Sequence, residues 1–297
     1  MRELRERLAA GDLIVGDGAW GTMLIARGLR PGVAPESWNL DRAGDLEEIA
    51  TLYVEAGADF ITTNTFGGSP VRLRAYGLDD RTEAINRAAV EAARRAAGDR
   101  AYVAASVGPS GELLKPYGDG DPAEIGDGFA RQIAALAGAG ADLIVVETMT
   151  DLTEARLAVE AARRVAPALP VVATMTFDRT RRGFFTVMGV SVPRAVAGLT
   201  GAGADVVGSN CGNGIEAMLE IAREMRAHAA VPLAIQSNAG LPESRAGALV
   251  YPETPEFMAS WVPALVEAGV RIIGGCCGTT PDHVRALRAA VDAARSS

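Results

Sequence analysis

Three cysteines are the residues of this chain whose positions most clearly predict chemistry. Cys276 and Cys277 are adjacent and lie between glycines, after an apolar run that ends at Ile273. The third, Cys211, also follows an apolar run and also precedes a glycine. Zinc favours thiolate ligands, and a catalytic zinc holds three protein ligands and leaves one position for substrate or water. Three converging thiols would provide such a site.

Three other roles are open to these cysteines. A free cysteine is often only a small buried hydrophobic residue, but that role does not explain why all three follow apolar runs. A disulfide between the neighbours Cys276 and Cys277 would require a strained ring. A structural zinc would need a fourth protein ligand. The two histidines, His228 and His283, are expected to have capping or surface roles instead.

The segments that would position the cysteines alternate between apolar β-branched runs and amphipathic, alanine-rich stretches. Runs such as 143–146 are apolar on both faces, which is typical of parallel strands covered by helices. The predicted strands are 13–17, 58–63, 101–107, 141–147, 170–176, 204–210, 231–237 and 270–275. The predicted helices are 45–56, 81–97, 123–139, 152–165, 192–200, 215–228, 255–268 and 281–294.

A recurrent junction supports this count of units. The sequence Ala-Gly-Ala-Asp stands at 56–59, 139–142 and 202–205, and 268–270 is a weaker copy. Glycine commonly ends a helix, so each copy predicts a boundary between a helix and the next strand. Eight such units without a linker predict a single α/β domain over residues 1–297, a (β/α)8 TIM barrel. The alternative is an open, doubly wound sheet.

In such a barrel the functional residues lie on the loops that follow the strands. One strand alone, 231–237, separates the two strands that end at the cysteines, so a closed barrel predicts that the three thiols converge. Asn238 ends the intervening strand and is a candidate for the fourth zinc position until a substrate displaces it. The residues at the strand ends are Asp17, Asn64, Gly108, Glu147, Phe177, Cys211, Asn238 and Cys276.

The segment from Gly16 to Gly21 matches the G-x-G-x-x-G dinucleotide fingerprint but lacks its context. That fingerprint needs a helix at once and a second strand that ends in an acidic residue about 20 positions on. The stretch 28–35, which carries two glycines and two prolines, breaks this pattern. A nicotinamide oxidoreductase is therefore disfavoured, and the glycines are expected to let the backbone approach a small ligand held by Asp17.

Composition narrows the possible partners. The chain has 297 residues, is 48% hydrophobic and carries a net charge of -8 without a basic stripe, which predicts no nucleic-acid partner and no anionic membrane surface. Its first residues lack the apolar core of a secretory signal, and no apolar run approaches the roughly 20 residues needed to span a bilayer. We expect a cytoplasmic protein with reduced thiols.

Five stretches of the chain resemble the homocysteine S-methyltransferase family, and they occur in the family's order. They are 17–24, 63–66, 210–212, 238–242 and 274–281. The sequences Asn238-Ala239-Gly240-Leu241-Pro242 and Cys276-Cys277-Gly278-Thr279-Thr280-Pro281 are most similar to the homocysteine-binding module of cobalamin-dependent methionine synthase. Members that use S-methylmethionine more often carry arginine at the position of Gly278.

The resemblance implies a zinc-dependent S-methyltransferase that activates homocysteine as a zinc-bound thiolate and converts it to methionine. Cys211, Cys276 and Cys277 would be the zinc ligands and catalytic residues. The residues that would bind substrate are Asp17, Gly18, Asn64, Thr65, Glu147 and Asn238. Asp17 and Glu147 would hold the amino-acid end, although either carboxylate could instead pair with an arginine or cap a helix.

The methyl donor stays open at this stage. Methylcobalamin supplied in trans by a corrinoid protein is one expectation, and a small donor such as betaine or S-methylmethionine is another. A protein of a different class is also possible, namely a non-catalytic zinc- or thiol-binding subunit of a larger corrinoid methyltransferase complex.

Overall fold

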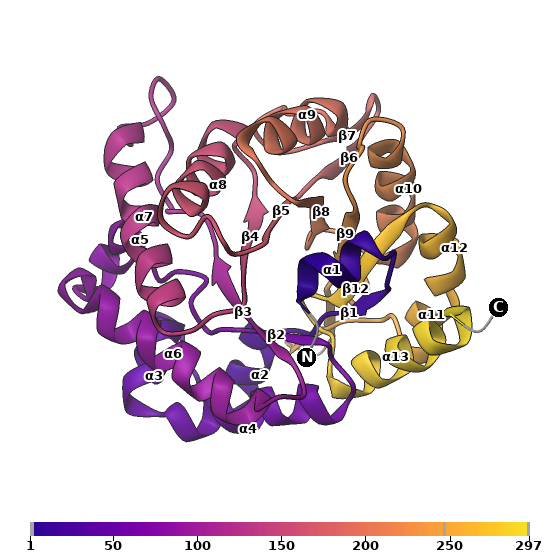
Figure 1. Ribbon diagram of the computed structural model, residues 1–297, viewed down its shortest axis with the longest axis horizontal. Helices are drawn as coiled ribbons and strands as arrows, with labels where there is room; N and C mark the ends of the chain where they lie inside the picture. The colour runs from indigo at the N-terminus through magenta and orange to yellow at the C-terminus, as the bar shows by residue number, and fades with distance from the viewer. Residues whose placement is uncertain (1–2, 246–247, 296–297) are drawn as a thin grey trace.

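Eight parallel strands form a nearly closed barrel in the computed structural model, which describes residues 3–245 and 248–295 (Figure 1). Around the barrel their order is β1-β12-β9-β8-β5-β4-β3-β2, and each neighbouring pair in this order is parallel. The predicted (β/α)8 barrel is therefore confirmed. The strands are β1 (Ile14–Val15), β2 (Phe60–Thr62), β3 (Tyr102–Val107), β4 (Leu143–Met149), β5 (Val171–Met175), β8 (Val206–Asn210), β9 (Leu233–Ser237) and β12 (Val270–Gly275).

Helices surround the barrel at all eight predicted positions (Figure 1). They are α4 (Ala43–Glu55), α6 (Thr82–Ala97), α7 (Pro122–Gly138), α8 (Leu152–Val165), α9 (Val192–Ala202), α10 (Ile215–Arg226), α11 (Pro255–Ser260) with α12 (Val262–Glu267), and α13 (Pro281–Arg295). The predicted helix 255–268 is broken at Trp261, because Pro263 has no N–H to continue the helical hydrogen bonds. None of the helices in the described part of the chain is both long and apolar enough to cross a membrane.

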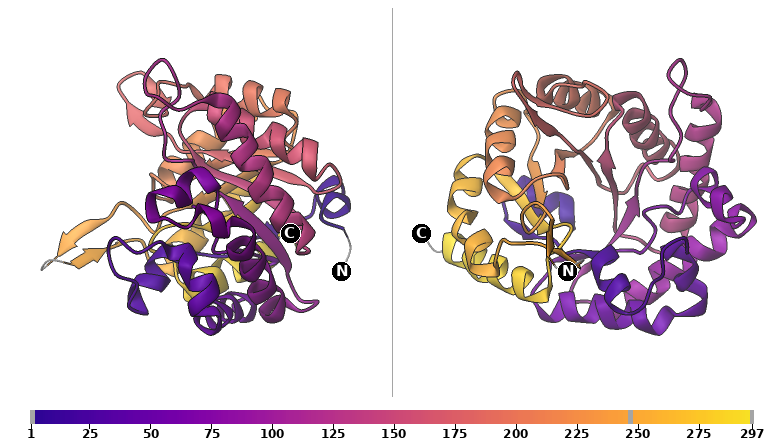
Figure 2. Two further views of the ribbon diagram at one scale, coloured as in Figure 1. Left: turned by 90° about the vertical axis from the view of Figure 1, so that its left-hand side faces the viewer. Right: turned by 180° about the vertical axis from the view of Figure 1, so that it is seen from behind.

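Several short elements in the loops were not predicted. The helical ones are α1 (Leu4–Ala9), α2 (Trp20–Ala26), η1 (Pro35–Ser37), α3 (Trp38–Asp41), α5 (Pro70–Leu73), η2 (Arg74–Tyr76) and η3 (Asp79–Arg81). Two hairpins, β6 (Asp178–Thr180) with β7 (Gly183–Phe185) and β10 (Glu243–Arg245) with β11 (Ala248–Val250), extend loops after β5 and β9. The hairpin β10–β11 projects well away from the barrel (Figure 2).

The amino-terminal end of the barrel is closed by α1. Leu4 and Leu8 of this helix are buried in one apolar cluster with inward-facing strand residues such as Phe60, Tyr102 and Ile272. In the view of Figure 1, α1 lies within the ring of strands, toward β1 and β12. This apolar cluster fills the amino-terminal half of the barrel interior. A polar site is therefore expected at the carboxyl ends of the strands.

Backbone and carboxylate contacts join β1 to β2, where the barrel closes. The N–H of Asp59 donates to the Val15 carbonyl at 2.7 Å, and the Asp59 carboxylate accepts from the Val15 N–H at 2.8 Å. At the other end of these strands, Oδ2 of Asp17 accepts from the Thr62 N–H at 2.7 Å. Asp17 thus links the segment after β1 to β2, at the carboxyl end of the barrel.

The three Ala-Gly-Ala-Asp junctions share one structure. Their glycines have φ between +96° and +106°, a left-handed conformation that glycine adopts at little cost, so the predicted helix ends are confirmed. Each aspartate accepts a backbone N–H from a neighbouring strand and pairs with arginine. The contacts join Asp59 to Val15, Arg7 and Arg288, Asp142 to Val103 and Arg94, and Asp205 to Val171, Arg5 and Arg163.

Candidate metal centre and substrate pocket

The three cysteine sulfur atoms meet at the carboxyl ends of β8 and β12. All three Sγ atoms lie within 4.8 Å of one another, and the Cys211 and Cys277 sulfurs are 3.9 Å apart. Strand β9 lies between the two cysteine-bearing strands. The convergence predicted from the strand ends is therefore confirmed, and the cluster has the size and chemistry of a thiolate metal site.

The backbone turns sharply where the cysteines emerge. Cys211 has φ of +60°, a left-handed conformation that is uncommon outside glycine, and its N–H donates to the Gln236 carbonyl at 3.1 Å. The N–H of Cys276 donates to the Ser237 carbonyl at 2.7 Å. Gly278 follows the pair with φ of +81°. These contacts to β9 direct thiols from two strands toward one point.

The three thiols differ in their pKa values. Hydrogen bonds from the Cys276 and Cys277 thiols lower the pKa of Cys211 to about 3. The bond to the Cys211 sulfur raises the pKa of Cys277 to about 11, and the pKa of Cys276 is raised as well. Cys211 is therefore the most acidic of the three thiols. A divalent cation would remove the remaining protons, because metal binding deprotonates a thiol.

Asn238 lies beside the cysteine cluster, and its role as a fourth ligand stays a prediction. Its side chain donates to the Cys211 sulfur and is 4% exposed. Within the described residues its Oδ1 is buried and has no hydrogen-bond partner. A buried carbonyl oxygen without a partner is costly, and a nearby cation would satisfy it. The three sulfurs fit a zinc site that keeps its fourth position open.

Asp17 lies at the end of β1, buried and surrounded by donors. Its Oδ2 accepts from the Trp20 Nε1–H at 2.9 Å and from the Thr62 hydroxyl at 2.9 Å, in addition to the Thr62 N–H. Burial outweighs these bonds and raises the pKa of Asp17 to about 6. Among the described residues it forms no ion pair, so the salt bridge considered as an alternative is absent there.

Glu147 extends from β4 into the same space. Its Oε1 accepts from the Ser106 hydroxyl at 2.5 Å. Burial raises the pKa of Glu147 to about 7, and the negative charges of Asp17 and Cys211 raise it further. The described part of the chain supplies no Arg or Lys partner for it. Glu147 thus interacts electrostatically with Asp17 and Cys211, and two carboxylates without a counterion among the described residues are suited to binding a cation.

Asn210 connects the carboxylate to the thiols and was not singled out by the sequence reasoning. Its Nδ2 donates to the Thr148 hydroxyl at 2.7 Å and lies 3.4 Å from Glu147 Oε2 and 3.9 Å from Cys276 Sγ. Its Oδ1 accepts from the Thr148 N–H at 2.8 Å. Thr148 has φ of +60°, which is strained for a β-branched residue. The position of Asn210 at a strand end, next to Cys211, was the available signal.

Gly18 follows Asp17 in a position where no side chain fits. An added Cβ would lie 2.8 Å from the Tyr53 ring and 2.9 Å from Thr279 Oγ1. The Thr279 hydroxyl also accepts from the Ala19 N–H at 3.1 Å. The glycine therefore lets the loop after β1 pack against the loop that carries the cysteine pair.

Asn64 and Thr65 were predicted to bind substrate, and the structure gives both side chains partners within the protein. The Asn64 amide donates to the Pro35 carbonyl at 2.8 Å and to Asn39 Oδ1 at 2.9 Å. Thr65 is fully buried, and its hydroxyl donates to the Ser106 carbonyl at 2.7 Å. These contacts fix the loop after β2, while contact with a substrate stays a prediction for both residues.

His283 caps the loop that follows the cysteine pair, as the sequence reasoning expected. Its Nδ1 accepts from the Thr280 N–H at 3.1 Å, so Nε2 carries the proton and donates to the Glu253 carbonyl at 3.0 Å. The ring is 7% exposed. Both ring nitrogens are thereby occupied.

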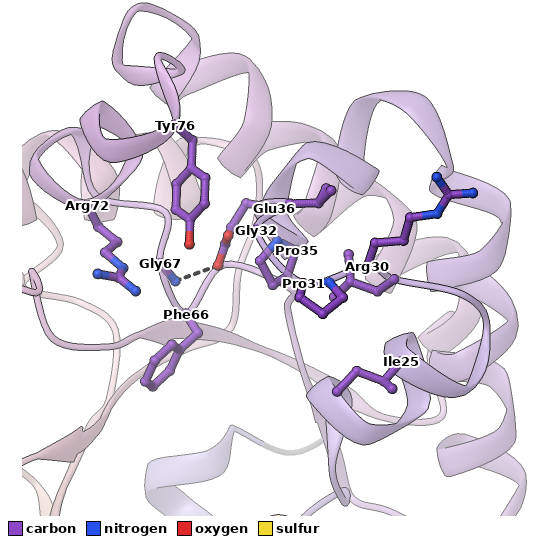
Figure 3. Close-up of a pocket in the computed structure, with 12 residues that line it drawn as sticks. Ile25, Arg30, Pro31, Gly32, Pro35, Glu36, Phe66, Gly67, Arg72 and Tyr76 are labelled. Atoms are coloured by element: carbon purple, nitrogen blue, oxygen red, sulfur yellow. Dashed lines mark hydrogen bonds between the residues drawn. The ribbon is translucent and has the colours of Figure 1, made fainter.

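A separate cavity of about 360 Å³ lies between the loops that follow β1 and β2 (Figure 3). Oε1 of the buried Glu36 accepts from the Gly67 N–H at 2.6 Å in its wall, and the Tyr76 hydroxyl points toward this pair. Burial raises the pKa of Glu36. The cavity shares no residue with the cysteine cluster or with the predicted substrate-binding set, so it is not part of the candidate site.

The glycine fingerprint has a structure unlike that of a dinucleotide site. The short helix α2 does follow it directly, which the sequence reasoning did not predict. The next strand, β2, ends at Thr62 and not at an acidic residue, and Asp17 within the fingerprint is committed to Thr62 and Trp20. The second requirement of a dinucleotide site is therefore not met.

Comparisons with known proteins agree with this geometry. The family model described as homocysteine S-methyltransferase matches residues 14–291. The chain is 35% identical to methionine synthase of Mycobacterium tuberculosis, with 94% of this chain aligned, and 34% identical to methionine synthase of Mycobacterium leprae, with 97% aligned. It spans about a quarter of the length of these relatives, 24% and 25%.

A solved structure matches over nearly its whole length. The metallated form of the homocysteine methyltransferase MmuM from Escherichia coli superposes with a TM-score of 0.80 at 26% sequence identity. The match covers 96% of this chain and 99% of that one.

Proposed function

Because the chain belongs to the homocysteine S-methyltransferase family, we propose that it transfers a methyl group to the sulfur of homocysteine and forms methionine. The observation that carries the proposal is the juxtaposition of three converging thiols with Asp17 and Glu147, two carboxylates for which residues 3–245 and 248–295 supply no counterion. Homocysteine has a thiol at one end and an ammonium at the other, so it matches both parts. Residues 1–297 would form one homocysteine-binding barrel domain.

Cys211, Cys276 and Cys277 would hold a zinc ion, with the Asn238 carbonyl oxygen beside the fourth position. When bound, zinc lowers the pKa of a thiol so that the sulfur reacts as a thiolate, which is the nucleophilic form. The support is the donor set itself, three sulfurs within 4.8 Å and one buried oxygen without a partner among the described residues.

Asp17 and Glu147 would bind the substrate ammonium. Their pKa values, about 6 and about 7, are raised mainly by burial, and a cation placed between them would lower both. The hydrogen bonds from Thr62, Trp20 and Ser106 keep each carboxylate in place before substrate arrives. Holding the amino-acid end in this way orients the sulfur toward the incoming methyl group, a proximity effect.

The methyl donor would be methylcobalamin carried by a partner corrinoid protein, or a small donor such as betaine or S-methylmethionine. Gly278, whose position more often carries arginine in members that use S-methylmethionine, has a structural explanation here. A Cβ at this position would lie 2.1 Å from Cγ of Tyr251. An arginine at this position would therefore require Tyr251 to move.

A panel of donors tests the proposal. Zinc-loaded protein is incubated with homocysteine and a donor carrying an isotopically labelled methyl group, namely methylcobalamin, betaine or S-methylmethionine, and labelled methionine is measured by mass spectrometry. We expect labelled methionine with at least one donor and none with the Cys276→Ala variant. Homocysteine binding without methionine from any donor would instead favour a non-catalytic thiol-binding subunit.

A further inference from the structure

One short segment lies across all three loops that form the cysteine cluster. This segment, Tyr251–Glu253, connects the hairpin β10–β11 to the residues that lead into α11, and we call it the strap. The N–H of Glu253 donates to the Ala239 carbonyl at 2.9 Å, in the loop after β9. Its Oε2 accepts from the Ile215 N–H at 3.1 Å, and its carbonyl accepts from His283 at 3.0 Å. A single residue thereby joins the loop after β9 to the first turns of α10 and α13, the helices that follow β8 and β12.

Three glycines leave room for the strap. A Cβ on Gly214 would lie 2.0 Å from Glu253 Oε1, and one on Gly240 would lie 3.0 Å from the Pro252 ring. The Cβ of a side chain at Gly278 would meet the Tyr251 ring. Gly214 has φ of -78°, which any residue adopts, so its need for glycine is the space that Glu253 occupies. Each glycine lies within three residues of Cys211, Asn238 or Cys277.

The contacts of the strap reach the metal-site residues through short links. Ala239, which accepts from Glu253, donates its own N–H to the Cys277 carbonyl at 3.0 Å. The Asn238 N–H donates to the Asn213 carbonyl at 3.0 Å, in the loop that Glu253 holds through Ile215. The Tyr251 side chain also contacts the Cys277 thiol directly. A movement of Glu253 would therefore change the spacing of Cys211 and Cys277.

We propose that the strap residues, chiefly Glu253, are positioning residues. They hold the loops that carry the cysteines so that the three sulfurs are arranged for a metal ion before it binds. The inference rests on the proposed function, since it assumes that the cysteine cluster binds a metal. The physical reason is pre-organisation, because a ligand set fixed before binding loses less conformational entropy when the ion arrives. Residues that orient metal ligands without touching the metal typically change metal affinity by 10- to 100-fold when they are replaced.

Metal affinity of strap variants tests this inference. Zinc affinity is measured by competition with a chromophoric chelator, and the coordination geometry is followed by the thiolate-to-cobalt absorption of Co²⁺-loaded protein. We expect Glu253→Ala to weaken zinc binding by about 10- to 100-fold and to alter the cobalt spectrum. Glu253→Gln keeps an acceptor for the Ile215 N–H and should restore most of the affinity. Glu256→Ala, an exposed glutamate in the first turn of α11, is the matched control and should behave as the wild type.

A second variant, Gly214→Ala, disturbs the position of the Glu253 carboxylate without changing Glu253. Gly214→Ala adds one methyl group where Glu253 Oε1 lies, so it should displace the carboxylate and weaken zinc binding while Glu253 itself is intact. If Glu253→Ala fails to fold, Glu253→Gln and Gly214→Ala decide the matter. Wild-type zinc affinity and cobalt spectra in Gly214→Ala and in the folded Glu253 variants would overturn the proposal.

The two proposals can fail separately. If the wild type binds zinc but methylates nothing, the strap can still be judged from its effect on metal affinity. If the wild type forms methionine while the strap variants keep their zinc affinity, the strap inference alone is wrong.

Discussion

The Ser106 hydroxyl donates a 2.5 Å hydrogen bond to Oε1 of Glu147, from β3 to the neighbouring strand β4. This bond holds a carboxylate in place that has no cationic partner among the described residues. Glu147 is therefore poised to receive a positive charge from a ligand, and it interacts electrostatically with Asp17. Several of the expected outcomes below depend on this pair of carboxylates and its position beside the thiols.

Replacing Glu147 by glutamine should weaken homocysteine binding while leaving the metal site intact. A hydrogen bond to a charged group contributes about 1.5–3 kcal/mol, so we expect a rise in Kd of about 10- to 100-fold. Calorimetry with zinc-loaded protein measures the affinity, and metal analysis should give the same zinc content as the wild type. Unchanged affinity in Glu147→Gln would assign the ammonium to another group.

Binding of the amino-acid end should strengthen as the pH rises through the pKa values of the two carboxylates. L-2-aminobutyrate lacks the thiol, so its affinity reports this end of the site without the metal. Near pH 5 both acids are mostly protonated, whereas near pH 8 both are mostly ionised and attract the ammonium. Titration calorimetry between pH 5 and 8 should show this increase in affinity. In Glu147→Gln, the increase near pH 7 that comes from ionisation of Glu147 should be lost. An affinity independent of pH would contradict the assignment.

Asp17 should make the ligand-free protein less stable as the pH rises, whereas ligand affinity should increase with pH. Folding raises the pKa of Asp17 from 3.8 to about 6, so between these values the native state binds the proton that the unfolded state has lost. The free energy of unfolding therefore falls as the pH rises from about 4 to about 6, by about 3 kcal/mol from this group. Denaturant unfolding of wild type and Asp17→Asn at pH 4 and pH 7.5 gives the difference. The variant should lose this contribution, and equal pH dependence in both would refute it.

Removing one thiol should abolish both metal binding and turnover. Cys211→Ala, Cys276→Ala and Cys277→Ala each leave two sulfurs, which is too few to hold a catalytic zinc. We expect zinc content near zero by metal analysis and no detectable methionine, with a folded barrel by circular dichroism. Treatment of the wild type with a chelator should give the same loss, and added zinc should reverse it. Full turnover in a zinc-free variant would disprove the metal-dependent mechanism.

The barrel and the cysteine cluster were predictable because both follow from strand periodicity. Apolar runs of five to seven residues between amphipathic helices specify eight strands, and a closed barrel then brings Cys211 and Cys277 to one end. The glycine junctions, such as Gly57, supplied the boundaries independently. Short helices and hairpins in the loops were not predictable, because elements of three to seven residues depend on tertiary contacts and not on their own periodicity.

Side-chain direction beyond a strand end was also outside the reach of sequence reasoning. Alternation of side chains holds only within a strand, so the sequence did not indicate that the amide of Asn64, just after β2, donates to Pro35 and Asn39. The role of Glu253 could not be predicted for a related reason. Its contacts reach the loop after β9 and the first turns of α10 and α13, and nothing in its own neighbourhood of sequence indicates them.

Leu4 and Leu8 of α1 close the barrel at the amino-terminal ends of its strands, and Arg295 of α13 donates to the Leu13 carbonyl at the same end. The cysteines lie at the opposite end. A chemical tether attached near Glu3 or Arg295 would therefore leave the thiol-bearing face exposed to solution. Protein immobilised in this orientation on a sensor chip or a bead would present the cysteine-bearing end of the barrel to the solution.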